Sequence, residues 1–244
     1  MSGITLAGYL MRHLLHSIAC LAALSGAPAA AETGPVVVEL YTSQGCSSCP
    51  PADAMLAELA ARDDVIALAL HVDYWDYIGW ADEFASPDHT RRQQDYAHAA
   101  GHTTIYTPQF VVGGVDLVIG AKGMKLADAI MAHSAVTLPV AVAVAREGGV
   151  ATISARMRED AVATGPFVIQ IAQIKSASTV DILRGENAGQ TIRYHNIVQS
   201  LDIVHQWDGL APVEVTADLG DPDTVAVIVQ QGTNGPVVGA ARLD

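Results

Sequence analysis

The chain has 244 residues, 50% of them hydrophobic and 16% charged, so it can bury the core of one large domain or of two small ones. Its formal net charge is −13, which argues against nucleic acid or an anionic membrane as a partner. Composition alone therefore predicts an acidic, soluble protein.

The first 31 residues have the pattern of a signal peptide. Arg12 makes the start basic, an apolar run follows from Leu14 to Leu24, and Ala29 and Ala31 fit a small-residue cleavage site. The run is too short and too broken to span a membrane. We therefore expect residues 1–31 to be removed and the remainder to be periplasmic or secreted.

The stretch that follows predicts a strand, a helix and a second strand. "GPVVVELYT" and "VIALALHVDY" are continuous apolar runs, typical of strands buried on both faces of a parallel sheet. Between them, apolar side chains recur at helical spacing from Ala52 to Ala60. Pro50 and Pro51 are compatible only with the first turn of that helix, so it begins close to Cys46 and Cys49.

Residues 74–134 predict two further helices and a hairpin. An aromatic-rich loop, "WDYIGWADEF", precedes a polar helix that begins after Ser86 and ends at Gly101. Gly113 and Gly114 then join two short strands, and a helix follows in "MKLADAIMAHSA". The expected element order up to residue 135 is β-α-β-α-β-β-α.

Residues 136–244 have a different sequence pattern, typical of β-strands without helices. Strand-like runs such as "LPVAVAVAR" and "TVAVIVQQG" alternate with Gly, Pro, Asn and Asp. We read this half as an antiparallel β-sandwich-like domain, or as a sheet that packs on residues 32–135 and never folds alone. No flexible linker separates the two halves, so we expect them to pack firmly.

The pair Cys46 and Cys49 is the leading candidate for chemistry. The start of a helix presents unpaired N–H groups and the positive end of the helix dipole, and both stabilise a thiolate. Cys46 should then be the exposed, attacking thiol, and Cys49 should resolve the mixed disulfide.

Three other interpretations of the pair compete. It could be a structural disulfide, or half of a zinc site, although no other cysteine follows residue 31. Cys46, Cys49 and His71 could instead hold copper. We favour the redox pair and expect no resident metal and no cofactor.

A possible groove lies beside the pair. His71 and Asp73 come at the carboxyl end of the second predicted strand, the edge where open α/β sheets bind ligands. Tyr74 and Trp75 concentrate scarce aromatic side chains there. These four residues could line a substrate groove, or they could be a packed loop.

The stretch "RGENAGQTIRYHNIV" is the conspicuous feature of the second half. Gly185, Asn187 and Gly189 indicate a turn. We expect a solvated hairpin tip, with the alternative that the tip reaches across to the first half.

Several of these motifs carry a family resemblance. The element order, "CSSC" after the first strand and "YTPQF" before the hairpin resemble the thioredoxin fold. In that family a cis-proline faces the cysteine pair and the backbone before it pairs with substrate, which implies a cis Thr107–Pro108 bond and a substrate-positioning role for both residues.

Four longer motifs carry a closer resemblance: "ELYTSQGCSSCPPAD", "HVDYWDYIGWAD", "YTPQ" and "GENAGQTIRYHNIV". Together they resemble a family of bacterial secreted proteins known as domain of unknown function 1223, with a thioredoxin-like core. The expected fold is thus an α/β thioredoxin-like N-terminal domain over 32–135 plus a β-rich, sandwich-like C-terminal domain over 136–244.

These observations predict a periplasmic or secreted thiol–disulfide oxidoreductase whose partner is a protein or a small thiol. The alternatives are a copper-binding or copper-delivery protein, and a non-catalytic binding module whose β-rich half recognises a partner.

Overall fold

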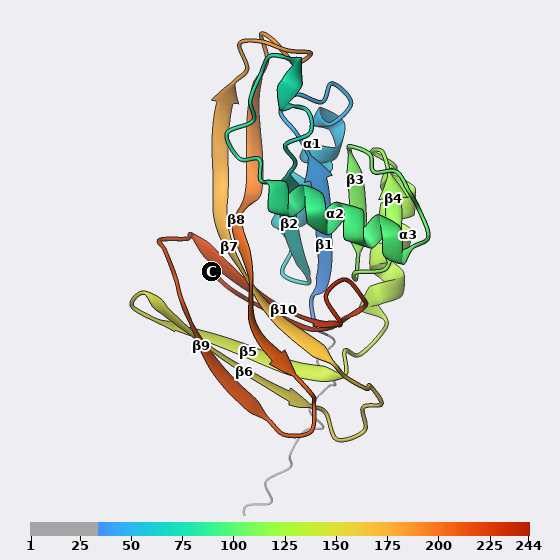
Figure 1. Ribbon diagram of the computed structural model, residues 1–244, viewed down its shortest axis with the longest axis vertical. Helices are drawn as coiled ribbons and strands as arrows, with labels where there is room; N and C mark the ends of the chain where they lie inside the picture. The colour runs from blue at the N-terminus through green and yellow to red at the C-terminus, as the bar shows by residue number, and fades with distance from the viewer. Residues whose placement is uncertain (1–33) are drawn as a thin grey trace, which may run out of the picture. The chain divides into compact units, whose positions relative to one another are not determined.

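Strand β1 (Val36–Thr42) is buried along its whole length inside an eight-stranded sheet. It pairs in parallel with β2 (Val65–His71) and antiparallel with β3 (Gln109–Val112). The computed structural model describes residues 34–244 (Figure 1), so the predicted signal peptide lies outside the described residues.

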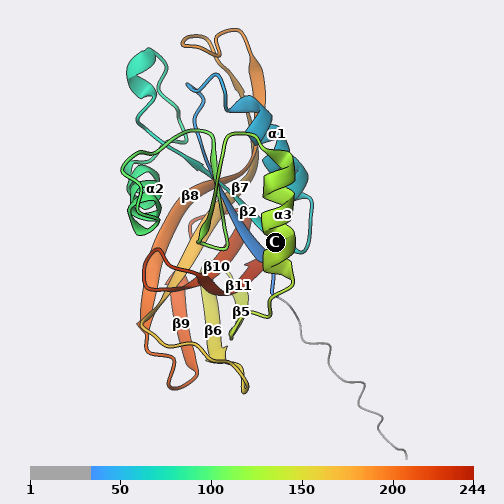
Figure 2. The ribbon, with the colours of Figure 1, turned by 90° about the vertical axis from the view of Figure 1, so that its right-hand side faces the viewer.

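Three α-helices cover the two faces of this part of the sheet. The structure describes α1 (Pro50–Ala60), α2 (Pro87–Ala99) and α3 (Gly123–Ser134), with a short 3-10 turn, η1 (Asp76–Ile78), before α2. Apolar residues of α1 and α3 pack with Val38 and Leu40 of β1, whereas Tyr96 of α2 packs with Val37 and Tyr41 on the opposite face. Figure 2 shows α1 and α3 on one side and α2 on the other.

The helix starts are those that the sequence predicts. Prolines occupy the first positions of α1, where an N–H has no partner within the helix. Ser86 caps α2 by accepting a hydrogen bond from the backbone N–H of Asp88.

The remaining strands join the same sheet or a small second one. The elements are β4 (Asp116–Ile119), β5 (Val140–Glu147), β6 (Val150–Met157), β7 (Phe167–Asp181), β8 (Thr191–Trp207), β9 (Val213–Asp218), β10 (Thr224–Gln231) and β11 (Val237–Leu243). The large sheet runs β11-β10-β7-β8-β2-β1-β3-β4, and β5-β6-β9 form the second sheet.

The predicted fold class is therefore wrong. Residues 34–244 are mostly β, and four strands of the expected C-terminal domain extend the N-terminal sheet instead of forming a separate sandwich-like domain beside a thioredoxin-like one. The reason lies at β2, which is fully buried and has a second edge that must be paired. Strand β8 pairs there in parallel, with Ile197 opposite Ala69, and the Asn196 side chain donates to the Ala67 carbonyl over 3.0 Å.

Strands β7 and β8 form a long antiparallel ribbon (Figure 1). The strands have 15 and 17 residues, at a rise of about 3.3 Å per residue. The end that holds Phe167 and Trp207 packs against apolar residues of the three-stranded sheet. Phe167 pairs with Trp207 at one end, and Asp181 pairs with Thr191 at the other. The turn over residues 182–190, which we call the tip, is thus carried far from the three-stranded sheet.

A buried ion pair ties the shared sheet to α2. The Arg92 guanidinium donates to both carboxylate oxygens of Glu39 in β1, over 2.6 and 3.0 Å. It also donates to Gln170 in β7 and to Gln230 in β10. Burial raises the pKa of Glu39, but Arg92 and the hydrogen bonds to the carboxylate outweigh it, so that the net pKa is lowered. One side chain thus joins strands from both halves of the sequence.

Within residues 34–244, no helix combines the length and the apolar character that a membrane crossing requires.

Candidate functional site

The two cysteines lie where β1 gives way to α1. After Thr42 the chain makes two tight turns, in which the Cys46 N–H donates to the Ser43 carbonyl and the Cys49 N–H to the Cys46 carbonyl. Cys49 is the residue immediately before the helix, and the N–H of Asp53 donates back to its carbonyl. The local sequence therefore places the pair at the N-terminus of α1, as predicted.

Cys46 and Cys49 form a disulfide, with their Cα atoms 5.4 Å apart. Only 1% of Cys46 and 0% of Cys49 is exposed. The expectation of an exposed Cys46 is therefore wrong for this disulfide form. Ser47 and Ser48, between them, are exposed and form the solvent-facing part of the loop.

The segment before β3 reaches the disulfide loop. The Ser48 hydroxyl donates to the Thr107 carbonyl over 3.4 Å, and the indole N–H of Trp75 donates to the Thr107 hydroxyl over 2.7 Å. Pro108 is buried and the Thr107–Pro108 bond is cis, as the resemblance implied. The structure thus brings Trp75, Thr107 and the cysteine loop together.

The tip of the β7–β8 ribbon covers the other side of this loop. The Asn187 amide group donates to the carbonyls of Gln44 and Cys46, over 2.9 and 3.0 Å. Glu186 accepts from the backbone N–H and the hydroxyl of Ser47, over 3.3 and 2.6 Å. Asn187 is buried and Glu186 is exposed. The expectation of a solvated hairpin tip is therefore wrong, and the alternative, that the tip reaches across to the first half, is confirmed.

Sequence reasoning allowed the tip to reach the first half but did not assign these contacts to Glu186 and Asn187. The only local signal was an asparagine between two glycines, Gly185 and Gly189, both of which adopt positive φ. That pattern indicates a turn but does not indicate which distant loop the turn contacts.

A buried polar cluster lies beneath the loop. His71 is fully buried at the end of β2, and its Nδ1 lies 2.7 Å from a carboxylate oxygen of Asp82. The same oxygen accepts the N–H of Gln44 over 2.8 Å. His71 is thus bonded to Asp82, a residue that the sequence did not single out.

Asp53 belongs to the same cluster. It is 7% exposed and accepts a hydrogen bond from the Thr42 hydroxyl over 2.8 Å. Burial raises the pKa of its carboxyl to about 7, against the opposing effects of nearby His71 and of the Thr42 hydrogen bond, while Asp82 raises it further. A carboxyl in the first turn of α1 is therefore held near the midpoint of its titration at neutral pH.

The other groove candidates face α2. Asp73 accepts from the Thr90 hydroxyl over 2.6 Å, and the Tyr74 hydroxyl donates to Gln93 over 3.1 Å. Within the aromatic-rich loop itself, Asp76 accepts the backbone N–H of Asp82 over 3.0 Å. These contacts fix the aromatic-rich loop on α2, with Trp75 as its link to Thr107.

No metal centre emerges from the described residues. Nowhere in 34–244 do three or more His, Cys, Asp or Glu side chains form a group that could hold a metal ion. Cys46, Cys49 and His71, the copper set considered above, are therefore not such a group.

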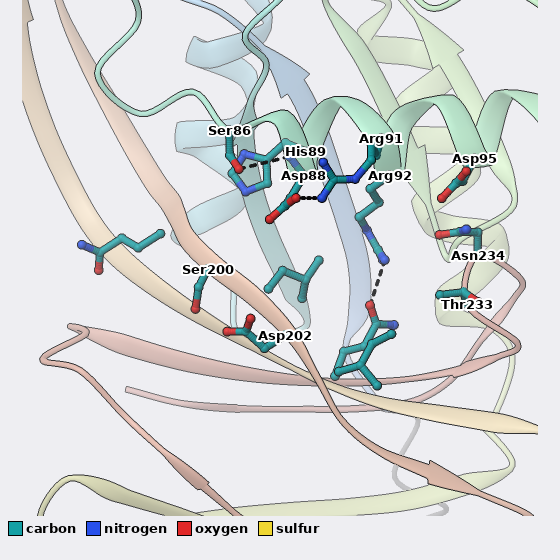
Figure 3. A pocket seen from close by; sticks show the side chains of 14 residues that line it. Ser86, Asp88, His89, Arg91, Arg92, Asp95, Ser200, Asp202, Thr233 and Asn234 are labelled. Atoms are coloured by element: carbon teal, nitrogen blue, oxygen red, sulfur yellow. Dashed lines mark hydrogen bonds and ion pairs between the residues drawn. The ribbon is translucent and has the colours of Figure 1, made fainter.

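A polar cavity of about 230 Å³ opens between α2 and β8, and none of the predicted site residues lines it. Two of its lining residues, Ser86 and His89, contact the backbone carbonyl of His71. Figure 3 shows Asp88, Arg91 and Asp95 on the α2 side and Ser200 and Asp202 on the side of β8. Its buried cation, Arg92, is already engaged by the hydrogen bonds described above. The cavity holds neither cysteine and none of the residues that contact the disulfide loop.

Two solved structures resemble this protein over most of the chain. A search of curated proteins found no match. A crystal structure of a protein from Agrobacterium tumefaciens is 33% identical, with a TM-score of 0.73, covering 87% of this chain and 95% of that one. HBP35 of Porphyromonas gingivalis is 18% identical, with a TM-score of 0.60, covering 86% of this chain and 75% of that one, which shows a shared fold alone.

The family model described as "Protein of unknown function (DUF1223)" matches residues 37–230. This match includes the disulfide, the tip of the β7–β8 ribbon and strands of both sheets. The chain therefore belongs to the DUF1223 family.

Proposed function

We propose that this protein is a thiol–disulfide oxidoreductase that uses Cys46 and Cys49. The observation that carries the proposal is the placement of the pair at the N-terminus of α1, beside Thr107 and Pro108. A helix N-terminus lowers the pKa of a cysteine thiol and so favours the thiolate, which is the reactive form.

The exchange has two steps. An external thiolate attacks Cys46 Sγ, the Cys46–Cys49 bond breaks, and Cys49 leaves as a thiolate that takes up a proton. A second external thiolate then attacks the external sulfur of the mixed disulfide and releases Cys46. Two external thiols are oxidised to one disulfide while the protein disulfide is reduced to two thiols, and the reverse sequence oxidises a substrate.

The roles of the neighbouring residues follow from their contacts. Thr107 and Pro108 would position a substrate chain, because the Thr107 carbonyl is already within reach of the cysteine loop. Trp75 holds Thr107 in place through its indole N–H. His71, Asp73 and Tyr74 have partners inside the protein, so they support the loop from behind.

The proposed setting is the periplasm or the exterior of the cell, and the proposed partner is a protein or small thiol. The basic, apolar and small-residue pattern of residues 1–31 supports this setting, as does a cysteine pair in the disulfide form.

Equilibration of the native protein in glutathione buffers of graded ratio tests the proposal. The expected result is a reversible, two-electron conversion between disulfide and dithiol while the protein stays folded, with Cys46→Ser abolishing it. A disulfide that resists glutathione and dithiothreitol until the chain is unfolded would mean that the pair is a structural crosslink.

A further inference from the structure

Glu186 places a negative charge at the entrance to the disulfide. Its carboxylate accepts two hydrogen bonds from Ser47, the residue that follows Cys46. The side chain is exposed, whereas both cysteines are buried. A group that approaches Cys46 past the exposed serines therefore passes this carboxylate.

Within residues 34–244, no ion pair neutralises the charge of Glu186. Its carboxylate is hydrogen-bonded to the backbone N–H and the hydroxyl of Ser47. Asp53 and Asp82, in the cluster beneath the loop, are also acids. Arg184, two residues before Glu186, is the one basic residue of the tip.

The charge of Glu186 opposes the reacting species. Thiol exchange proceeds through the thiolate, so every attacking thiol brings a negative charge to Cys46. Additional charges on the reactant then add to the repulsion or offset it. At a separation of about 6 Å in water, one unit charge changes the rate of approach of another by roughly threefold.

We propose that Glu186 selects the partner of the Cys46–Cys49 disulfide by charge, disfavouring anionic thiols and favouring a cysteine flanked by basic groups. This inference rests on the proposed function. It assigns the tip of the β7–β8 ribbon to substrate selection, a role beyond that of the cysteines themselves.

The test compares three small thiols of similar size. In the reactive thiolate form, cysteamine, 2-mercaptoethanol and 3-mercaptopropionate carry net charges of about 0, −1 and −2, because cysteamine keeps an ammonium group and 3-mercaptopropionate a carboxylate. Rates of disulfide reduction are measured for the parent protein and for Glu186→Gln. Glutamine keeps an acceptor oxygen for Ser47 and removes the charge. Because each thiol is compared with itself, differences in intrinsic thiol reactivity cancel.

The expected gains on Glu186→Gln at low ionic strength are about onefold, threefold and tenfold in that order. Salt at about 1 M should flatten this series, because it screens exposed charges. Glu147→Gln is the matched control, because it removes an exposed charge at the end of β5. Its rates with all three thiols should equal those of the parent protein.

Two results would overturn the inference. Equal gains for all three thiols would show that Glu186 acts without regard to the charge of the reactant, while the proposed function would stand. Failure of all three thiols to reduce the native parent protein would remove the proposed function and this inference together. A second variant, Glu186→Lys, reverses the charge. We expect its gains in rate to rise more steeply from cysteamine to 3-mercaptopropionate than those of Glu186→Gln.

Discussion

The side-chain amide of Asn187 donates a hydrogen bond to the backbone carbonyl of Cys46 over 3.0 Å, although 141 residues separate them. The same amide group donates to the Gln44 carbonyl. A turn from the C-terminal half of the sequence therefore holds the cysteine loop in its buried position.

Replacement of Asn187 by Ala should expose the disulfide. Each of its two buried hydrogen bonds contributes about 1 kcal/mol, so their loss should raise the rate of reduction by dithiothreitol tenfold or more in the folded protein. Asn234→Ala, in the turn between β10 and β11, is the matched control and should leave the rate unchanged. An unaltered rate for Asn187→Ala would show that the tip does not govern access.

The Arg92–Glu39 ion pair should make a large contribution to the free energy of unfolding, because it ties strands from both halves of the sequence together. Arg92→Ala leaves a carboxylate buried without its cation, which typically costs about 3–5 kcal/mol of unfolding free energy. Arg91→Ala removes the neighbouring, exposed arginine, whose ion pair with Asp88 is on the surface, and should cost less than about 1 kcal/mol. Denaturant unfolding of both variants measures the contrast, and equal losses would refute the assignment of a central role to Arg92.

Asp53 should make stability fall as the pH rises. Its folded pKa is raised from 3.8 to about 7, so the folded state holds a proton that the unfolded state has lost between these values. The contribution of Asp53 to the free energy of unfolding is therefore fully present below about pH 4. It is lost as the pH rises through 7, and the loss amounts to up to about 4 kcal/mol. Unfolding free energies measured from pH 4 to pH 8 should show this decline.

Asp53→Asn removes the titration and should flatten that decline. Asp63→Asn, at an exposed acid after α1, should retain the slope of the parent. If Asp53→Asn and the parent show the same pH dependence, the carboxyl is ionised in the folded state and its burial is compensated by other groups.

The individual elements near the disulfide could be predicted because their signals are local. Pro50 and Pro51 identify the start of α1, and the continuous apolar runs identify β1 and β2. Ser86 marks the start of α2 through its own hydrogen bond to the backbone. Such signals depend on a few adjacent residues, so one sequence is enough.

The assembly of the strands could not be predicted in the same way. That β8 fills the open edge of β2 depends on pairing between Ala69 and Ile197, and alternation along each strand gives no information about its partner. The contacts of Asp82 with His71 and of Asn187 with Cys46 were missed for the same reason. An isolated polar residue in a loop gives the same sequence signal whether its side chain is solvated or buried.

The thiol pKa of Cys46 tests the central claim most directly. It can be measured from thiolate absorbance against pH in the native Cys49→Ser variant, where Cys46 is the single thiol of residues 34–244. The account predicts a value depressed by the helix N-terminus into the range of about 3.5–7.5. A pKa at or above that of free cysteine, about 8.5, would contradict the oxidoreductase proposal and leave the pair as a structural disulfide.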